Sequence, residues 1–240
     1  MDLAEIKKID NSFARSLISR VSRYVAPPPK LKISEWASKF RKLSREASNE
    51  SGTWRNEKTP YLVGIMDALC DPRCQEVVVQ ASAQVGKSEA ILNILGYYIA
   101  HDASSILCVL PNLDTVQSIS KDRLAPMLRD SPAFKGLFDD PKAKDTSNTI
   151  SHKVFPGGKL SIVTALSPSG LASRPCRIVL CDEVDRFPAS SANEGDPIKL
   201  AIRRQDSYSH NRKFIATSTP THHLTSRIHK FFTSEICKRH

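Results

Sequence analysis

The chain contains the stretch Glu76-Val-Val-Val-Gln-Ala-Ser-Ala-Gln-Val-Gly-Lys-Ser88, followed directly by Glu89-Ala-Ile-Leu-Asn-Ile-Leu95. The apolar run, the small and polar residues and the helix-forming segment predict a strand, a phosphate-binding loop and a helix. In this arrangement the backbone N–H groups at the helix start bind phosphate oxygens. Lys87 reaches the β- and γ-phosphates, and the Ser88 hydroxyl ligates Mg²⁺. The stretch therefore predicts a site for ATP and Mg²⁺.

The loop departs from the usual pattern at its first position, where Ala81 stands in place of glycine. That glycine is dispensable if the backbone there avoids positive φ. Gly-Lys-Ser also occurs by chance in exposed turns, so the loop alone leaves a purely structural turn open. The residues predicted to surround the phosphates are Ala81, Ser82, Ala83, Gln84, Val85, Gly86, Lys87 and Ser88.

A second element lies further along the chain, at Arg177-Ile-Val-Leu-Cys-Asp-Glu183. A buried parallel strand of this kind delivers its terminal carboxylates to the carboxyl edge of a sheet. Asp182 is the predicted magnesium ligand. Glu183 is the predicted base that orients and deprotonates the attacking water. An ordinary strand with a solvated acidic turn remains the alternative for this element alone, but the two elements in this order predict an ATPase.

Composition agrees with a globular enzyme. The chain has 240 residues, 40% of them apolar and 25% charged, which suits one α/β domain with an extension. No apolar run approaches the roughly 20 residues of a membrane span, and the polar N-terminus does not resemble a signal peptide. The six cysteines include no C-x-x-C pair, so reduced thiols are favoured over a zinc site. We expect a cytoplasmic protein without a membrane partner.

The net charge of +10 is concentrated at the two ends. Residues 1–60 hold 13 Lys and Arg against 7 Asp and Glu, and residues 201–240 hold 8 against 2. The middle of the chain has 14 against 16. Basic segments on both sides of a near-neutral nucleotide-binding region indicate a nucleic-acid partner, with a merely solvated basic surface as the alternative.

A run of three prolines near the N-terminus marks a predicted linker between two parts of the chain. Residues 1–25 have apolar positions at helical spacing, and Ala26-Pro-Pro-Pro29 stops that helix and forms a linker. We therefore expect a basic helical extension over residues 1–59, with a second helix from Ser34 to about Ser44. The ATPase domain is expected over residues 60–240 and begins with a helix over 60–69.

The remaining pattern alternates strands and helices, which predicts a three-layer α/β P-loop NTPase with a largely parallel central sheet. One hairpin is expected within it, around Pro156-Gly-Gly158. The further elements are expected as strands at 105–110, 152–155, 159–163 and 213–217, with a helix at 114–129.

Several ordered motifs together resemble the large terminase subunit of tailed bacteriophages, of the lambda-like GpA type. The similarity runs from about Pro27 to about Phe232. Besides the two elements above, the motifs are Pro60-Tyr-Leu, Met66-Asp-Ala-Leu69, Gly170-Leu-Ala-Ser-Arg-Pro175, Glu183-Val-Asp-Arg-Phe-Pro188, Glu194-Gly-Asp-Pro197 and Thr217-Ser-Thr-Pro220.

The resemblance implies a motor that uses ATP to package double-stranded viral DNA into an empty procapsid, in the bacterial host cytoplasm. It implies a homo-oligomer that works with a terminase small subunit and the portal of the procapsid. Ser218 and Thr219 match the segment that couples hydrolysis to DNA movement. An arginine that neutralises the γ-phosphate often comes from a neighbouring subunit; Arg174 is the first candidate, beside Arg203 and Arg204, although Arg174 could instead brace its own loop.

Full-length members of the family resemble a packaging ATPase joined to a C-terminal endonuclease. After Asp206 only Glu235 remains as an acidic residue, so no carboxylate cluster for a two-metal nuclease is expected in this chain. Two other functions stay open: a helicase-like DNA translocase, and a truncated prophage remnant that only binds nucleotide or DNA.

Overall fold

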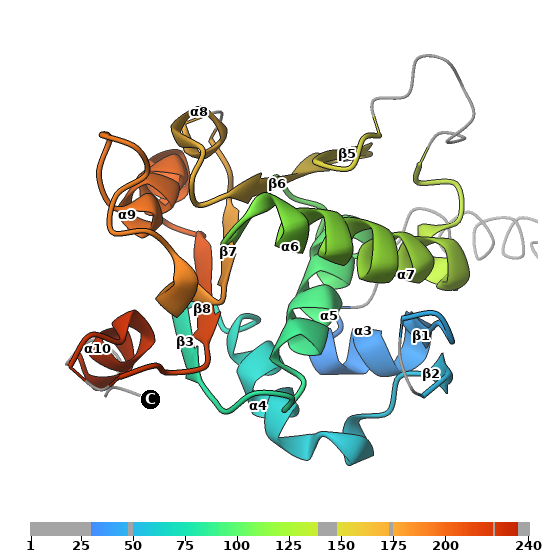
Figure 1. Cartoon of the computed structure of the whole chain (residues 1–240). Coiled ribbons are helices and arrows are strands. Elements are labelled where there is room, and N and C mark those ends of the chain that lie inside the picture. The colour runs from blue at the N-terminus through green and yellow to red at the C-terminus, as the bar shows by residue number, and fades with distance from the viewer. Residues whose placement is uncertain (1–29, 48–49, 139–147, 173–174, 223, 235–240) are drawn as a thin grey trace, which may run out of the picture. The chain divides into compact units, whose positions relative to one another are not determined.

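The strand and helix on either side of the phosphate loop form as the sequence predicts, as β3 and α5 of a computed structural model (Figure 1). The structure describes residues 30–47, 50–138, 148–172, 175–222 and 224–234. The predicted helix over 1–25 and the linker over 26–29 lie outside them. Among the described residues, no helix is both long and apolar enough to cross a membrane.

The central sheet contains six strands in the order β3-β8-β7-β4-β6-β5. All neighbouring pairs are parallel except β5 and β6, which form the predicted antiparallel hairpin. Two further strands, β1 and β2, pair in a separate small sheet. The strands are β1 Lys42–Leu43, β2 Gly52–Thr53, β3 Glu76–Gln80, β4 Ile106–Leu110, β5 His152–Phe155, β6 Gly158–Thr164, β7 Ile178–Asp182 and β8 Lys213–Ser218.

Helices cover both faces of the central sheet (Figure 1). The α-helices are α3 Ile33–Phe40, α4 Pro60–Ala68, α5 Lys87–Ala100, α6 Leu113–Ser118, α7 Ala125–Asp130, α8 Pro168–Leu171, α9 Pro197–Ile202 and α10 Arg227–Thr233. A π-helical segment, Ile119–Leu124, joins α6 to α7. Short 3₁₀ segments lie at Asn56–Lys58, Pro132–Phe134, Val184–Arg186 and Arg203–Tyr208.

Alternate residues of the central strands enter two different cores. In β4, Ile106 and Cys108 pack with α3, α4 and α5, while Leu107 and Val109 pack with α8, α9 and α10. The apolar runs of the sequence are therefore buried on both sides, as expected for inner strands of a parallel sheet. The predicted three-layer α/β fold with a largely parallel sheet is confirmed.

The first described helix belongs to the same core as the phosphate-loop helix. Trp36 of α3 lies over α5 at Gly96, where a Cβ atom would come within 2.4 Å of the indole ring. The compact unit begins at Leu31. The packing therefore does not separate residues 31–59 from residues 60–240, where the sequence pattern placed a boundary.

Two helix predictions differ from the structure in detail. The helix expected over 34–44 ends at Phe40, because Arg41 is extended and its side chain enters the core beside α5. The helix expected over 114–129 forms from Leu113 to Asp130, but its centre is π-helical. The first difference brings the β1–β2 segment toward the phosphate loop.

Candidate nucleotide site

The phosphate loop connects β3 to α5, and its backbone explains the residue types. Gly86, which caps α5, has φ +82, a left-handed conformation that favours glycine. Ala81 does not have positive φ, whereas Gln84 has φ +60. The alanine in place of the usual first glycine is therefore compatible with this loop. The N-terminus of a 14-residue helix then points into the site, where it favours an anion.

Lys87 is buried, with 6% of its surface exposed, and its ammonium group lies inside the loop. Its Nζ atom donates to the carbonyl oxygens of Ser82 at 2.7 Å and Ala81 at 3.3 Å. It also donates to the Thr219 hydroxyl at 2.8 Å. Thr219 follows β8, so one positive charge joins the phosphate loop to the end of the neighbouring strand. Phosphate oxygens would replace these neutral acceptors with charged ones.

Asp182 ends β7 and is 2% exposed. Its Oδ2 atom accepts a hydrogen bond from the Ser88 hydroxyl at 3.1 Å, and its Oδ1 atom accepts from the Glu183 N–H at 3.0 Å and from the Thr217 hydroxyl. A hydroxyl and a carboxylate oxygen this close form the kind of oxygen pair that Mg²⁺ uses when phosphates and water complete its coordination. The residues present therefore fit a magnesium ion.

Glu183 follows Asp182 with φ +57, a left-handed conformation that is unusual for a non-glycine residue. Burial raises the pKa of its carboxyl group, and the neighbouring Asp182 carboxylate adds to the rise while Lys87 opposes it. The side chain faces the pocket described below. A carboxyl with a raised pKa at such a position suits a general base.

The two residues predicted at the end of β8 differ in their roles. Thr219 contacts Lys87, as described above. The Ser218 side chain is fully buried; it accepts from the Asp185 N–H at 3.2 Å and donates to the Thr219 carbonyl at 3.1 Å. The Ser218 carbonyl accepts from the Ala81 N–H at 3.3 Å. Ser218 therefore holds the phosphate loop against the end of β8 through its carbonyl group. Its side chain does not line the pocket.

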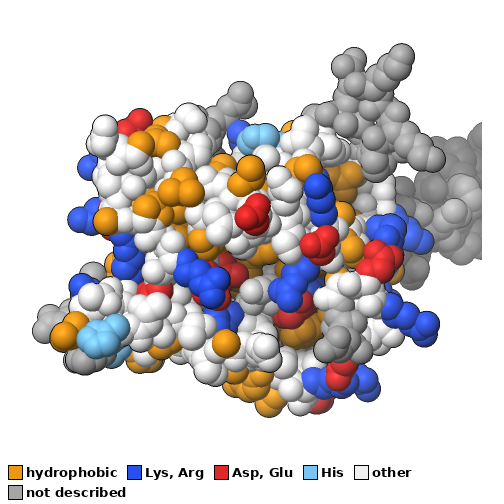
Figure 2. Space-filling model, viewed as in Figure 1, with side chains coloured by type: hydrophobic (Ala, Val, Ile, Leu, Met, Phe, Trp, Pro, Cys, Tyr) orange, Lys and Arg blue, Asp and Glu red, His pale blue; other side chains and the backbone are white. Residues whose placement is uncertain are grey.

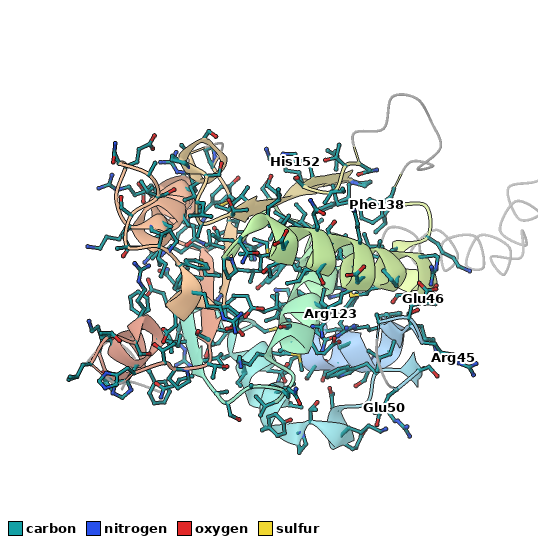
Figure 3. The ribbon with its side chains drawn as sticks, in the orientation of Figure 1. Arg45, Glu46, Glu50, Arg123, Phe138 and His152 are labelled. Atoms are coloured by element: carbon teal, nitrogen blue, oxygen red, sulfur yellow. The ribbon has the colours of Figure 1, made fainter. Side chains whose placement is uncertain are left out.

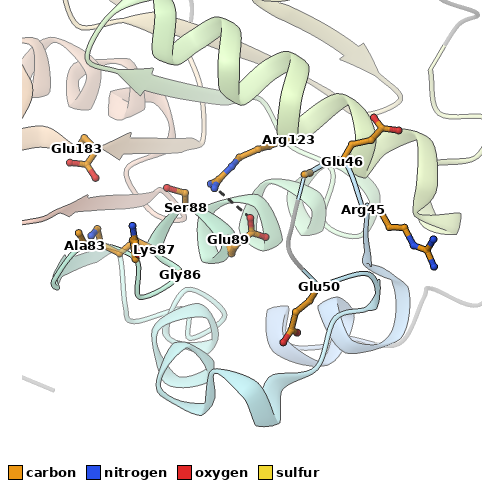
Figure 4. A pocket seen from close by; sticks show the side chains of 12 residues that line it. Arg45, Glu46, Glu50, Ala83, Gly86, Lys87, Ser88, Glu89, Arg123 and Glu183 are labelled. Atoms are coloured by element: carbon orange, nitrogen blue, oxygen red, sulfur yellow. Dashed lines mark ion pairs between the residues drawn. The ribbon is translucent and has the colours of Figure 1, made fainter.

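A pocket of about 760 Å³ opens beside the phosphate loop (Figure 4). One wall comes from predicted residues: Ala83, Gln84, Gly86, Lys87, Ser88 and Glu183. Glu89 continues this wall along α5. The opposite wall comes from residues that no sequence motif pointed to: Arg45, Glu46, Ala47, Glu50 and Arg123. Basic and acidic side chains lie close together on this face of the molecule (Figure 2).

The second wall is assembled from segments far apart in the sequence. Arg45, Glu46 and Glu50 lie in the connection between β1 and β2, and Arg123 lies on the helix that joins α6 to α7 (Figure 3). Glu89 pairs with the buried Arg41 and, at 3.8 Å, with Arg123. Arg41 also donates to the Glu89 carbonyl at 3.0 Å and to Asn93 at 2.5 Å. Burial lowers the pKa of Arg41, while Glu89 counteracts this effect.

Of the three predicted arginines, the two that the structure describes lie away from this pocket. Arg174 is outside the described residues. Arg203 and Arg204 belong to the 3₁₀ segment after α9, and neither lines the pocket. Arg204 instead donates to the Ala172 carbonyl at 3.2 Å. Arg123 is thus an arginine in this pocket that the sequence pattern missed.

Comparisons with known proteins identify a family for this chain. The family model described as "Phage terminase large subunit gpA, ATPase domain" matches residues 48–235. Over 207 residues the chain is 28% identical to the terminase large subunit of Enterobacteria phage P21, covering 84% of this chain and 31% of that protein. Over 179 residues it is 28% identical to the terminase large subunit of Escherichia phage lambda, covering 74% of this chain and 28% of that protein.

The chain therefore spans about a third of the length of these relatives. Among solved structures, it is similar to the crystal structure of the HK97 bacteriophage large terminase, with a TM-score of 0.60 and 13% identity. That match covers 78% of this chain and 37% of the HK97 chain. At this level of identity the likeness concerns the fold.

Proposed function

The chain belongs to the phage terminase large subunit gpA family, within its ATPase domain, and we propose that it hydrolyses ATP to drive double-stranded DNA into a procapsid. The observation that carries this proposal is the 3.1 Å contact between Ser88 and Asp182 at the start of α5. It brings the two predicted motifs together, and a hydroxyl beside a carboxylate oxygen supports the proposal of a Mg²⁺ ion that also contacts ATP.

Each residue of the site has a distinct role in this proposal. Lys87 and the N–H groups of residues 81–88 bind the phosphates, with Thr219 beside the ammonium group. Ser88 and Asp182 hold Mg²⁺, which when bound neutralises charge on the β- and γ-phosphates. Glu183 orients the attacking water and removes its proton. Ser218 keeps the loop in register with β8, so that a change at the phosphates reaches that strand.

We further propose that Arg174 of a neighbouring subunit completes the site in a homo-oligomer. The loss of such an arginine typically costs about 10³ to 10⁵ in rate, so an isolated subunit should hydrolyse ATP slowly. The two basic ends of the chain would contact DNA phosphates. The terminase small subunit, the portal and the procapsid are the proposed partners, in the bacterial host cytoplasm.

The test is a paired measurement of ATP affinity and turnover for wild type, Lys87→Ala and Glu183→Gln, with and without linear duplex DNA. Lys87→Ala removes a charge from the phosphates, so ATP affinity should fall. Glu183→Gln keeps the shape of the side chain but cannot act as a base, so turnover should stop while affinity remains. Wild-type turnover in Glu183→Gln would contradict the proposed mechanism, and ATP affinity unchanged in Lys87→Ala would contradict the site.

A further inference from the structure

Arg123 lies at an irregular point of the helix that runs from α6 to α7. The segment Ile119–Leu124 is π-helical, and such segments inside α-helices often occur at functional sites. Arg123 lines the pocket together with Lys87, Ser88 and Glu183, but from the opposite wall. Its guanidinium group points into the pocket toward Glu89 (Figure 4).

Arg123 is held only loosely in this position. Its Nη1 atom is 3.8 Å from Glu89 Oε1, and no hydrogen bond accompanies this ion pair among the described residues. The Arg123 side chain is 38% exposed. Ion pairs of this kind contribute little to stability, because solvent screens them. The contact with Glu89 alone therefore gives no strong reason for an arginine at this position.

Glu89 does not depend on Arg123 for its charge balance. Its other carboxylate oxygen, Oε2, pairs with Arg41, which is 2% exposed and also binds the Glu89 carbonyl. The Arg41 guanidinium is fixed further by Asn93 at 2.5 Å and by the Trp54 ring at 5.2 Å. Arg123 can therefore leave Glu89 without exposing an unpaired buried charge.

We propose that Arg123 binds the γ-phosphate of ATP from within the same chain. This inference rests on the proposed function, since it requires ATP in the pocket. A guanidinium group binds phosphate oxygens through two parallel hydrogen bonds, which is a stronger contact than a single pairing with Glu89 at 3.8 Å. The γ-phosphate is the group expected beside Glu183, which lines the same pocket. Arg123 thus supplies a positive charge in addition to Lys87.

The test compares the binding of ADP with that of adenylyl-imidodiphosphate, a triphosphate that is not hydrolysed, in the full chain with Mg²⁺. Arg123→Ala should weaken triphosphate binding about 10-fold to 100-fold, the scale of one lost charged hydrogen-bond donor, and change ADP binding little. Arg123→Lys keeps the charge but not the planar fork, so it should recover part of the loss. Lys121→Ala is the matched control, because Lys121 is exposed on the same π-helical segment and does not line the pocket.

Other outcomes separate this inference from the proposed function. Equal losses of affinity for ADP and the triphosphate in Arg123→Ala would show that Arg123 acts only through the shape of the pocket. Unchanged affinity for both would show that Arg123 does not bind the nucleotide. If Lys87→Ala weakens binding while Arg123→Ala does not, only this inference fails. If Lys87→Ala also has no effect, the nucleotide site itself is wrong. Thermal unfolding of each variant shows whether a loss of binding reflects a loss of folded protein.

Discussion

The two walls of the pocket beside the phosphate loop are built in different ways. The first wall is formed by the connections that follow β3 and β7. Asp182 and Thr219, at the ends of β7 and β8, lie behind it and hydrogen-bond to Ser88 and Lys87. The second wall is formed by the β1–β2 connection and the helix around Arg123, and the buried Arg41 braces it from behind. The residues of the first wall belong to contiguous motifs. Those of the second wall come together through packing between distant segments.

This difference leads to different consequences of mutation. Polar groups of the first wall rest on a sheet whose inner strands are buried on both faces, so we expect the fold to depend little on their charge. The second wall depends on one buried guanidinium that bonds to Glu89 and Asn93. We therefore expect changes in the first wall to reduce activity with little loss of stability, and changes behind the second wall to reduce both.

The largest effect is expected from Asp182→Asn. The amide can still accept from Thr217 and Glu183, and the Ser88 hydroxyl can accept from the new amide nitrogen, so the hydrogen bonds remain satisfied. In the proposed mechanism this change removes a magnesium ligand, so turnover should fall by at least about 10²-fold, since a metal contributes several kcal/mol of transition-state stabilisation. Steady-state ATP hydrolysis over a range of Mg²⁺ concentrations measures this loss.

The same protein should unfold thermally at the wild-type temperature or above it, because Asn removes a charge from a residue that is 2% exposed. A marked fall in unfolding temperature would show that the first wall does depend on its charges. Turnover near the wild-type value would show that Asp182 does not hold the metal.

The sequence predicted the first wall because each of its parts is local. A strand, a loop and a helix start follow one another in residues 76–95, and Asp182 and Glu183 directly follow a run of apolar residues. The parallel arrangement of strands then brings these ends to one edge of the sheet. Thr217 was missed as a partner of Asp182, although its place one residue before Ser218 in a core strand offered a signal.

The second wall could not be predicted in the same way. Arg41 falls in a region that looks like the end of a helix, and its burial depends on Asn93 and Glu89, which lie on another helix. Arg123 carries no motif, and its direction depends on a π-helical segment that apolar periodicity does not reveal. Contacts of this kind depend on tertiary packing, which local sequence patterns do not encode.

The next largest effect is expected from Arg41→Ala. The substitution leaves the Glu89 carboxylate and the Asn93 side-chain oxygen without their buried partner. Breaking a buried ion pair by removing one partner costs about 3 to 5 kcal/mol, and we expect the lower end because Glu89 is partly exposed. Urea unfolding measures the loss of stability, and ATP affinity should fall with it.

Arg129→Ala is the control for this variant. Arg129 also forms ion pairs, with Glu46 and Asp130, but its side chain is 56% exposed, so little change in urea unfolding is expected. If Arg41→Ala unfolds at the same urea concentration as Arg129→Ala, the second wall does not depend on the buried guanidinium.

The smallest effect is expected on the stability of Glu183→Gln. This prediction concerns its free energy of unfolding, which is separate from the loss of turnover expected above. Burial and the neighbouring Asp182 raise the pKa of Glu183 in the folded protein, so the ionised carboxylate is less favourable there than in the unfolded chain. A carboxyl group whose pKa is higher in the folded protein than in the unfolded chain favours the folded state at pH values below the unfolded-state pKa. This contribution to the free energy of unfolding is lost as the pH rises through the folded-state pKa. At pH 7 the wild type therefore carries an unfavourable charge that Gln lacks. The variant should be more stable at pH 7 by less than about 1 kcal/mol, because solvent screens a partly exposed carboxylate.

The stability difference between Glu183→Gln and wild type should shrink as the pH is lowered toward about 4, because the wild-type carboxyl then becomes protonated in the folded protein and increasingly in the unfolded chain. Urea unfolding of the two proteins at pH 7 and near pH 4 gives the comparison. A variant that is less stable at pH 7, or an advantage that grows as the pH falls, would mean that Glu183 is held by favourable contacts like those of Asp182. The first wall would then depend on its charges for stability as well as for activity, and the contrast between the two walls would narrow.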